Sequence, residues 1–217
     1  MRLVCDLHLH SRHSYDCKAD VRAILATAIS KKIDVLSITD HNSLAGSVEA
    51  MQLVKKEKLP ILLIPGQEVK TKQGELLVYG IREQLQPKQD VIATVKRAKE
   101  LGATIIAPHP FDWLRSGVGK ALPSVLPYLD AIEGFNAKTI FNGMDSKAQE
   151  AAKKHHLPTI SSSDAHLISE IGTCATIVDA SAKTEAAVLK AICAGKITEI
   201  RQRISFSQRL KSTFQKV

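Results

Sequence analysis

Two histidines alternate with apolar residues near the start of the chain, in the run VCDLHLHS over residues 4–11. Residues two apart on an extended strand share one face, so the imidazoles of His8 and His10 would project in the same direction. At the end of a strand, such a pair can bind one metal ion. Surface strands carry His-x-His by chance, so this pair alone is a moderate signal.

Further histidines and carboxylates follow later apolar runs, in SITDHN, PGQEV, TIIAPHP and SSSDAH. The side chains concerned are Asp40, His41, Glu68, His109, Asp164 and His166. If each run is a strand, these side chains lie at strand C-terminal edges, where the active sites of barrels and open α/β sheets assemble. The repetition at several strand ends predicts one shared site.

The types of these side chains limit the metal that they would bind. Imidazoles and carboxylates without thiolates suit zinc, manganese or iron. The candidate ligands are His8, His10, Asp16, His41, Glu68, His109, Asp164 and His166. Because one zinc ion needs only about three or four ligands, the excess predicts two or three divalent ions that share a carboxylate. Such a site favours hydrolysis of a phosphate ester or an amide.

The elements that would position these residues alternate along the chain. Expected strands are Arg2–His8, Asp34–Thr39, Ile61–Val69, Glu75–Ile81, Thr104–Pro108, Ala131–Gly134, Thr159–Ser163 and Cys174–Val178. Expected helices are Asp20–Lys31, Ser43–Lys58, Asp90–Leu101, Asp145–His156 and Thr184–Ala194. This alternation predicts an α/β fold with a parallel sheet, either a closed or distorted barrel or an open doubly wound sheet. No glycine-rich nucleotide-binding loop follows any of the strands.

Length and composition predict a single cytoplasmic domain. The chain has 217 residues, of which 44% are hydrophobic, and this excludes a mostly disordered protein. No apolar run reaches the roughly 18–20 residues that span a bilayer, and the charged start MRLVCDLHLH is unlike a signal peptide. The four cysteines form no C-x-x-C pair, which favours a reducing compartment.

Positive charge is in excess, with 30 Lys and Arg against 22 Asp and Glu. The excess indicates an anionic partner such as a phosphate ester or nucleic acid, or it serves solubility alone. Residues 201–217 carry five basic residues and no acid, and Phe206, Leu210 and Phe214 share one helical face. We therefore expect a domain over residues 1–200 and a basic amphipathic helix or tail over 201–217, which either docks on the body or binds a partner.

The ordered motifs DLHLHS, ITDHN, PGQEV, His109-Pro110, DAIEGFN and SSSDAH resemble those of the polymerase and histidinol phosphatase (PHP) domain. The resemblance covers about residues 5 to 172 and implies a distorted seven-stranded (β/α) barrel, similar to a TIM barrel, with a two- or three-metal phosphoesterase site. By motif position, it implies one ion at His8, His10, Glu68 and Asp164, a second between Glu68 and His109, and another at Asp16, His41 and His166.

One departure from the family pattern affects the second ion. Many three-metal members have a further histidine in the strand after the bridging glutamate, but the corresponding run here, GELLVYGIREQ, has none. We expect two firmly held ions and a weak third. Glu75 either compensates for the absent histidine as a ligand or is a surface glutamate, and the surface position is favoured. Glu133 and Asn136 are expected in the wall of the site, and Asp40 in a position that orients a ligand imidazole or forms a turn.

The expected function is a metal-dependent phosphoesterase in which a metal-activated hydroxide attacks phosphorus, with Asp164, His166 and Glu68 as catalytic residues. Arg115 would hold the substrate phosphate or be an exposed loop residue. The substrate would be a small phosphorylated compound, a nucleotide or a short oligonucleotide, and no membrane partner is expected. The alternative is a non-catalytic PHP-type barrel that binds RNA or protein. Amide hydrolysis is disfavoured because no lysine at a strand end could form a bridging carbamate.

Overall fold

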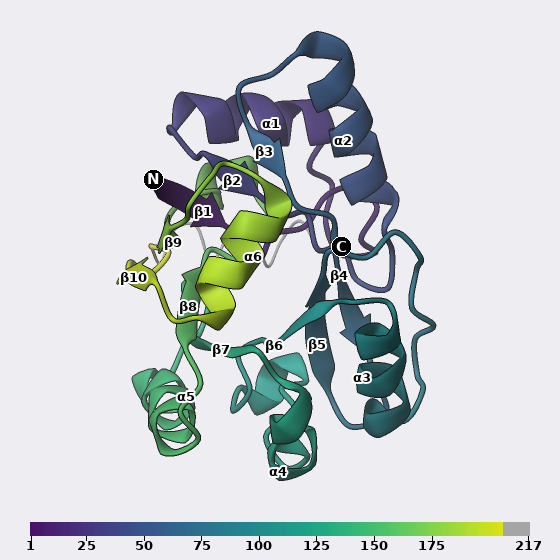
Figure 1. Ribbon diagram of the computed structural model, residues 1–217, viewed down its shortest axis with the longest axis vertical. Helices are drawn as coiled ribbons and strands as arrows, with labels where there is room; N and C mark the ends of the chain where they lie inside the picture. The colour runs from purple at the N-terminus through teal and green to yellow at the C-terminus, as the bar shows by residue number, and fades with distance from the viewer. Residues whose placement is uncertain (206–217) are drawn as a thin grey trace.

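A computed structural model describes residues 1–205, which form two five-stranded sheets surrounded by helices (Figure 1). The first sheet has the order β10-β9-β1-β2-β3, with β1 Arg2–Asp6, β2 Val35–Leu36, β3 Leu62–Leu63, β9 Ala175–Asp179 and β10 Ile197–Ile200. The second has the order β4-β5-β6-β7-β8, with β4 Gly66–Lys70, β5 Glu75–Tyr79, β6 Thr104–Ala107, β7 Ala131–Asn136 and β8 Thr159–Ser162.

The helices are α1 Val21–Ser30, α2 Ala45–Glu57, α3 Val91–Glu100, α4 Leu122–Val125, α5 Asn142–Lys154 and α6 Glu185–Cys193, with 3₁₀ turns η1 Trp113–Arg115, η2 Leu126–Tyr128 and η3 Ile168–Glu170. Helices α1, α3 and α6 begin one residue after the expected starts Asp20, Asp90 and Thr184, whereas α2 begins two residues after its expected start and α5 three residues before. Side chains of Asp20, Asp90 and Thr184 accept hydrogen bonds from backbone N–H groups in the first turns of α1, α3 and α6. The α/β class is therefore confirmed. None of the described helices combines the length and apolarity needed to cross a bilayer.

The prediction of parallel pairing holds for only part of each sheet. Strands β1, β2 and β3 are parallel, as are β6, β7 and β8. Strands β4 and β5 pair antiparallel because the tight turn Thr71–Gly74 joins them without a crossover helix. Strands β5 and β6 also pair antiparallel, and in the first sheet β9 is antiparallel to both β1 and β10. The strand expected over Ile61–Val69 is divided at Pro65 into β3 and β4, which belong to different sheets.

Two isolated parallel bridges connect the sheets. One pairs Leu9, after β1, with Ala165, after β8, and the other pairs His41, after β2, with Glu68 in β4. Both bridges adjoin residues that the sequence places in the candidate site. The site is therefore built where the two sheets meet.

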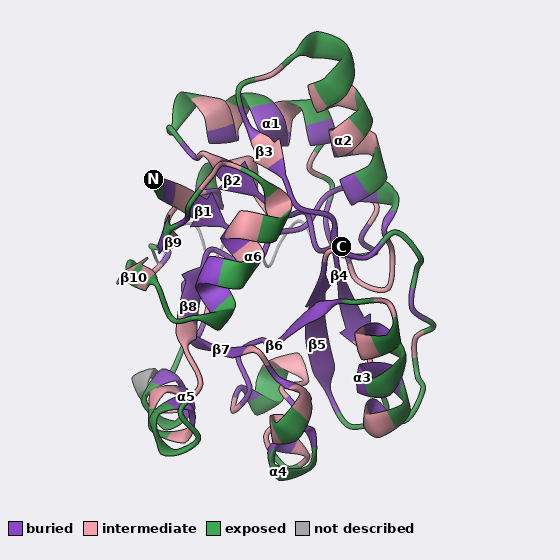
Figure 2. Cartoon of the chain, in the orientation of Figure 1, coloured by how far each residue is buried: buried purple, intermediate pink, exposed green. Residues whose placement is uncertain are grey.

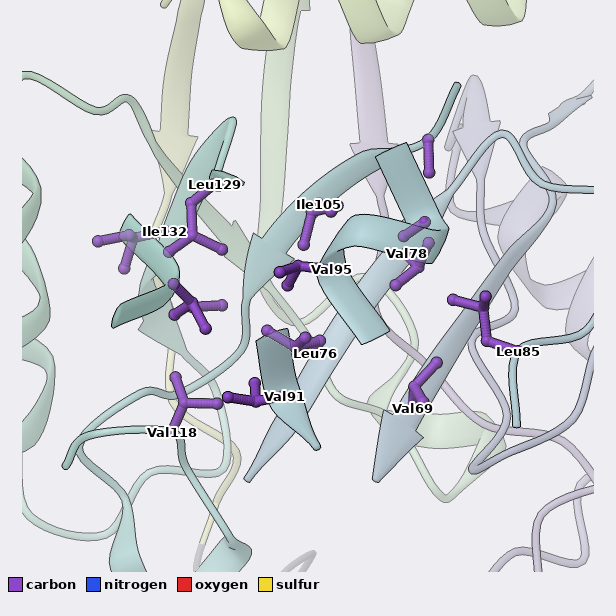
Figure 3. Packing of buried hydrophobic residues seen from close by; sticks show 14 of the residues in the cluster. Val69, Leu76, Val78, Leu85, Val91, Val95, Ile105, Val118, Leu129 and Ile132 are labelled. Atoms are coloured by element: carbon purple, nitrogen blue, oxygen red, sulfur yellow. The ribbon is translucent and has the colours of Figure 1, made fainter. Parts of the chain in front are cut away.

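The core explains why so many strand residues are apolar. Leu77 and Tyr79 of β5 point inward to a cluster with Leu7 and Ile106, while Leu76 and Val78 point outward to helix α3 (Figure 3). Both faces of β5 are buried, so Leu76, Leu77 and Val78 form a continuous apolar run. Figure 2 shows the same division, with buried residues on the strands and exposed residues on the outer faces of the helices.

Only the first five residues of the expected basic helix or tail are described. Residues 201–205 form neither helix nor strand. The Arg203 guanidinium lies 4.1 Å from the centroid of the Phe135 ring and pairs with Asp145, which fastens this segment beside β7 and α5. Residues 206–217 of the expected basic helix lie outside the described residues.

A close approach between α2 and the strand ends depends on Gly46. Asp40 accepts hydrogen bonds from Ser11 N at 2.6 Å and from Ser11 Oγ at 2.7 Å, which ties the loop after β1 to the loop after β2. A Cβ atom at Gly46 would overlap the Asp40 carboxylate and lie 2.6 Å from Ser11 Oγ. Only glycine lets α2 pack this closely against the hydrogen-bonded pair.

We predict that Gly46→Ala destabilises the protein by about 1–2 kcal/mol. The gain of about 1 kcal/mol in helix propensity is smaller than the overpacking cost of about 1–3 kcal/mol, because the Asp40 carboxylate is held in place. Gly143→Ala in α5 is the matched control, since no atom lies within 4 Å of its added Cβ and stability should rise. Urea unfolding measures both changes, and a Gly46→Ala variant as stable as Gly143→Ala would contradict the prediction.

Candidate metal centre

An open cavity of about 240 Å³ lies at the C-terminal ends of the strands. Its wall is formed by residues from loops after β1, β2, β6, β7 and β8 and from the hairpin β4–β5. Three cationic side chains, Lys70, Arg115 and Lys138, contribute to the wall. The cavity is therefore placed where the sequence motifs converge.

Six of the eight candidate ligands line this cavity, and the other two, His8 and His10, lie beside them with their Nε2 atoms 3.3–3.6 Å from carboxylate oxygens of Glu68 and Asp164. Four overlapping groups have ligand atoms within 4.8 Å of one another: His10, Asp16, His41 and His166; His8, His109 and Asp164; His8, His10 and Glu68; and Glu68, Glu75 and His109. Glu68, His8 and His10 belong to more than one group. Sharing of this kind is what neighbouring cation positions require.

The buried ligand atoms lack hydrogen-bond partners of their own. His8 and His10 are at most 1% exposed, yet their Nε2 atoms have no hydrogen-bond partner among the described residues, and the same holds for Glu68 Oε1. His8 Nε2 lies 3.4 Å and His10 Nε2 lies 3.3 Å from Glu68 Oε2. Burying unpaired polar atoms is costly. Imidazole nitrogens and carboxylate oxygens that face a common point therefore fit divalent metal ions.

Electrostatics also favour a cation in the cavity. Burial lowers the pKa of His8, but the negative charges of Asp164, Glu68 and Glu133 outweigh burial and raise the pKa well above its usual value. Burial and the neighbouring His166 and His41 lower the pKa of His10 to about 3. His10 is thus neutral, which is the form of imidazole that binds a metal.

Glu133 orients two of the histidines from behind. Its Oε1 accepts a hydrogen bond from His8 Nδ1 at 3.0 Å, and its Oε2 accepts from the His109 backbone N–H at 2.8 Å and from Asn136 Nδ2 at 2.9 Å. With Nδ1 donating, the lone pair of His8 Nε2 faces the cavity. The structure thus places Glu133 and Asn136 in the wall, behind the ligand atoms.

The group around Asp16 is held by a different set of contacts. Asp16 Oδ2 lies 3.0 Å from His166 Nε2 and 3.6 Å from His41 Nε2. The His166 backbone N–H donates to Glu170 Oε2 at 2.8 Å, and Cys17 Sγ lies 3.2 Å from His166 O and 3.3 Å from His10 O. Cys17 therefore steadies the backbone of two ligands and offers no ligand atom itself.

Two of the site residues adopt left-handed backbone conformations. The φ angles of His109 and Asp164 are +26° and +50°, which cost about 1–3 kcal/mol each for residues other than glycine. Hydrogen bonds hold these conformations, including Asp112 N to His109 O at 2.9 Å. The left-handed backbone conformation at these two residues directs both side chains toward the cavity.

Arg115 is a partly buried residue with several hydrogen-bond partners, and not an exposed loop residue. Its guanidinium donates to Asp112 Oδ2 at 2.9 Å, to Asn136 Oδ1 at 3.1 Å and to Thr139 Oγ1 at 3.1 Å, and it pairs with Asp164. The Asp164 carboxylate is thus oriented by an arginine at the cavity wall. Asp40 orients the loop through Ser11 and does not itself contact a ligand imidazole.

The expectation that Glu75 is a surface residue is wrong. Glu75 is 4% exposed and groups with Glu68 and His109 at the cavity. Burial and the charge of Glu68 raise the pKa of Glu75 to about 8. The missed signal is the short turn ending in Gly74, which reverses the chain and returns Glu75 to the end of β4.

Comparisons with known proteins agree with these observations. Residues 146–197 match a family model described as PHP-associated. The chain is 32% identical over 142 residues to the uncharacterized protein MJ1587 of Methanocaldococcus jannaschii, covering 61% of this chain and 81% of that protein. It is 32% identical over 81 residues to the 5′-3′ exoribonuclease Rnm of Escherichia coli, covering 36% of this chain and 27% of Rnm.

Solved structures show the same fold. A two-domain protein from Bacteroides vulgatus, described as containing a predicted PHP-like metal-dependent phosphoesterase, superposes with a TM-score of 0.78. The match covers 100% of this chain and 70% of that chain, at 19% identity. This likeness concerns the arrangement of the backbone.

We predict that Glu133→Gln weakens binding of Mn²⁺ or Zn²⁺ by about 10–100-fold and destabilises the protein by about 1–3 kcal/mol. Both carboxylate oxygens accept hydrogen bonds, so the amide NH₂ of glutamine would face donors. Isothermal titration calorimetry and urea unfolding measure the two effects. Glu150→Gln on the exposed face of α5 is the control, and equal metal affinity in the two variants would contradict the role of Glu133.

Proposed function

Because this chain belongs to the polymerase and histidinol phosphatase (PHP) family, we propose that it is a metal-dependent phosphoesterase. The reaction would be hydrolysis of a phosphomonoester, a nucleotide or a short oligonucleotide. One observation supports this above all: buried imidazole nitrogens and a carboxylate oxygen, without hydrogen-bond partners among the described residues, face a common cavity.

The ligand assignment follows the side-chain groups around the cavity. We assign His8, His10, Glu68 and Asp164 to one ion and Asp16, His41 and His166 to another, with His109 beside Glu68. The absence of thiolates from these groups suits zinc, manganese or iron. When bound, such ions supply Lewis acidity and offset negative charge on phosphoryl oxygens.

The protein side chains would position the substrate and move its protons. Arg115 holds the Asp164 carboxylate and places a permanent positive charge at the cavity wall, where phosphoryl oxygens would lie. Asp164 and His166 face the cavity. Burial raises the pKa of Asp164, but the charges of His8 and Arg115 lower it well below its usual value, so His166 is the residue that would donate the proton to the leaving oxygen. Glu68, between the groups, would keep their ligand atoms at a constant separation.

We further infer that the two five-stranded sheets close into one distorted barrel, which would contain more strands than the seven expected from the sequence. The bridges Leu9–Ala165 and His41–Glu68 join the sheets at the cavity, and residues of both sheets share one interior cluster that includes Leu7, Leu77 and Ile160. This arrangement supports a closed form similar to a TIM barrel, with the active site at the usual end.

An exposed tyrosine at the rim suggests that the substrate carries an aromatic group. The Tyr15 ring stacks on His41, with centroids 5.0 Å apart and planes 23° apart, while 77% of the residue stays exposed. Lys70 and Lys138 lie in the same wall. A stacking surface beside cationic groups and a hydrolytic centre fits a nucleotide. The similarity to an exoribonuclease supports the same substrate class.

We predict that the purified protein carries stoichiometric transition metal and cleaves phosphate esters with Mn²⁺ or Zn²⁺. Asp164→Asn should lower kcat by about 100-fold or more, because it removes a charged ligand of the proposed metal centre. Metal analysis and a panel of phosphomonoesters and dinucleotides provide the measurements. Glu150→Gln should retain full activity.

Protein without bound metal that cleaves no member of the panel would contradict the phosphoesterase proposal. That result would favour a non-catalytic barrel that binds RNA or protein, which is the alternative function.

We also predict that Tyr15→Ala lowers kcat/KM for adenosine monophosphate relative to glycerol phosphate by about tenfold, since base–aromatic stacking contributes about 1–3 kcal/mol. Tyr15→Phe keeps the ring and should preserve the ratio. Equal losses for both substrates in Tyr15→Ala would indicate a structural role for Tyr15 and contradict the stacking role.

A further inference from the structure

Glu75 reaches the cavity because of the hairpin between β4 and β5. Glu68 lies directly opposite Leu77 in the antiparallel register, and Lys70 lies opposite Glu75. Opposed residues share a face of a sheet, so Glu68 and Glu75 are diagonal neighbours on the inward face. The carboxylate of Glu75 therefore extends the ligand set along β5.

The turn before Glu75 is built to hold this position. Gly74 has a φ angle of +143°, and a Cβ atom there would lie 2.6 Å from Val118 Cα. Thr71 N and Oγ1 both donate to Gly74 O, at 2.8 and 2.6 Å, and Glu75 N donates to Ser116 O at 3.0 Å. The backbone on both sides of Glu75 is thus fixed, which keeps its side chain directed at the cavity.

Glu75 and Glu68 form a group of two carboxylates with one imidazole. Ligand atoms of Glu68, Glu75 and His109 lie within 4.8 Å of one another, and all three residues are at most 5% exposed. Glu68 Oε1 has no hydrogen-bond partner among the described residues, and the nearest cation recorded for Glu75 is Lys70 Nζ at 3.9 Å. Two buried carboxylates this close to each other require more positive charge than one distant, partly exposed lysine supplies.

The donor atoms differ sharply between the two sides of the cavity. His10, Asp16, His41 and His166 offer three imidazoles and one carboxylate, whereas Glu68, Glu75 and His109 offer two carboxylates and one imidazole. Imidazole suits zinc and iron, while carboxylate oxygens suit manganese and magnesium. The two sides therefore differ in the ions that they favour.

We propose that Glu75 replaces a histidine ligand and completes, with Glu68 and His109, an oxygen-rich third cation position. The ratio of Mn²⁺ affinity to Zn²⁺ affinity is higher at this position than at the nitrogen-rich position around Asp16. The inference rests on the proposed metal-dependent function, since it assigns a further ligand to the same centre. It goes beyond that function by stating that the centre holds unlike ions at unlike positions.

The test counts bound ions and does not use activity. Metal-free full-length protein is titrated with Mn²⁺, and the electron paramagnetic resonance signal of the free ion gives the number and affinity of bound ions. A second titration with Zn²⁺ displaces Mn²⁺, and metal analysis after dialysis gives the final occupancy. The variants are Glu75→Gln, Glu75→His and the exposed control Glu150→Gln.

Wild type and Glu150→Gln should bind one more equivalent of Mn²⁺ than Glu75→Gln, or bind it at least about tenfold more tightly. Retention of zinc by Glu75→Gln at the nitrogen-rich position reports that the variant is folded. Glu75→His should bind the additional ion again, with its Mn²⁺-to-Zn²⁺ affinity ratio lowered by about tenfold. This variant tests the selection even where Glu75→Gln does not fold.

Three results would overturn the inference. Equal Mn²⁺ binding by wild type and Glu75→Gln excludes Glu75 as a ligand, and an unchanged affinity ratio in Glu75→His excludes the selection of ions. In both cases the proposed function stands, because wild type still binds metal. A wild-type chain that binds neither ion overturns the inference and the proposed function together.

Discussion

The buried carboxylate of Glu68 is the constraint around which the rest of the molecule is arranged. It is 1% exposed and lies 3.1–3.4 Å from nitrogens of His41, His10, His8 and His109. Its backbone also joins the two sheets, since Glu68 bridges to His41 and its carbonyl accepts from Asn42 N at 2.8 Å. One residue thus fixes both the seam between the sheets and the spacing of the ligand atoms.

A site of this kind lowers the free energy of unfolding, and the hydrogen bonds around the site reduce this loss of stability. Unpaired buried nitrogens and the positive φ angles of His109 and Asp164 are unfavourable in themselves. Glu133 and Arg115 hold these ligands with several hydrogen bonds each, and the apolar strands beneath them are buried on both faces. The strained ligands are therefore supported by the most rigid part of the molecule, which keeps ligand atoms in place before any ion binds.

The sequence allowed most of the site to be predicted because its ligands are encoded locally. His8 ends an expected strand, and His41, His109 and Asp164 each stand within two residues after one, so their side chains converge because strand ends in an α/β fold converge. For Glu75 the sequence favoured the surface position over the ligand position, because Glu75 begins a strand and its place depends on β5 running antiparallel to β4. The division of the strand at Pro65 was missed for a related reason, because an apolar run does not show which sheet each half will join.

The charges of the ligand set explain how a cavity lined by acids can receive an anion. Asp16, Glu68 and Asp164 would repel a phosphate if their charges were left uncompensated, and the neutral form of His10 does not offset them. The raised pKa of Glu75 favours its uncharged form near neutral pH, and the raised pKa of His8 favours a cation beside these carboxylates. Divalent ions reverse the sign of the field at the floor of the cavity, while Lys70, Arg115 and Lys138 keep the wall positive. The overall formal charge of +8 then acts in the same direction as the site. Under the proposed function, bound ions would favour a phosphorylated substrate, because carboxylates that are paired with divalent cations no longer repel it.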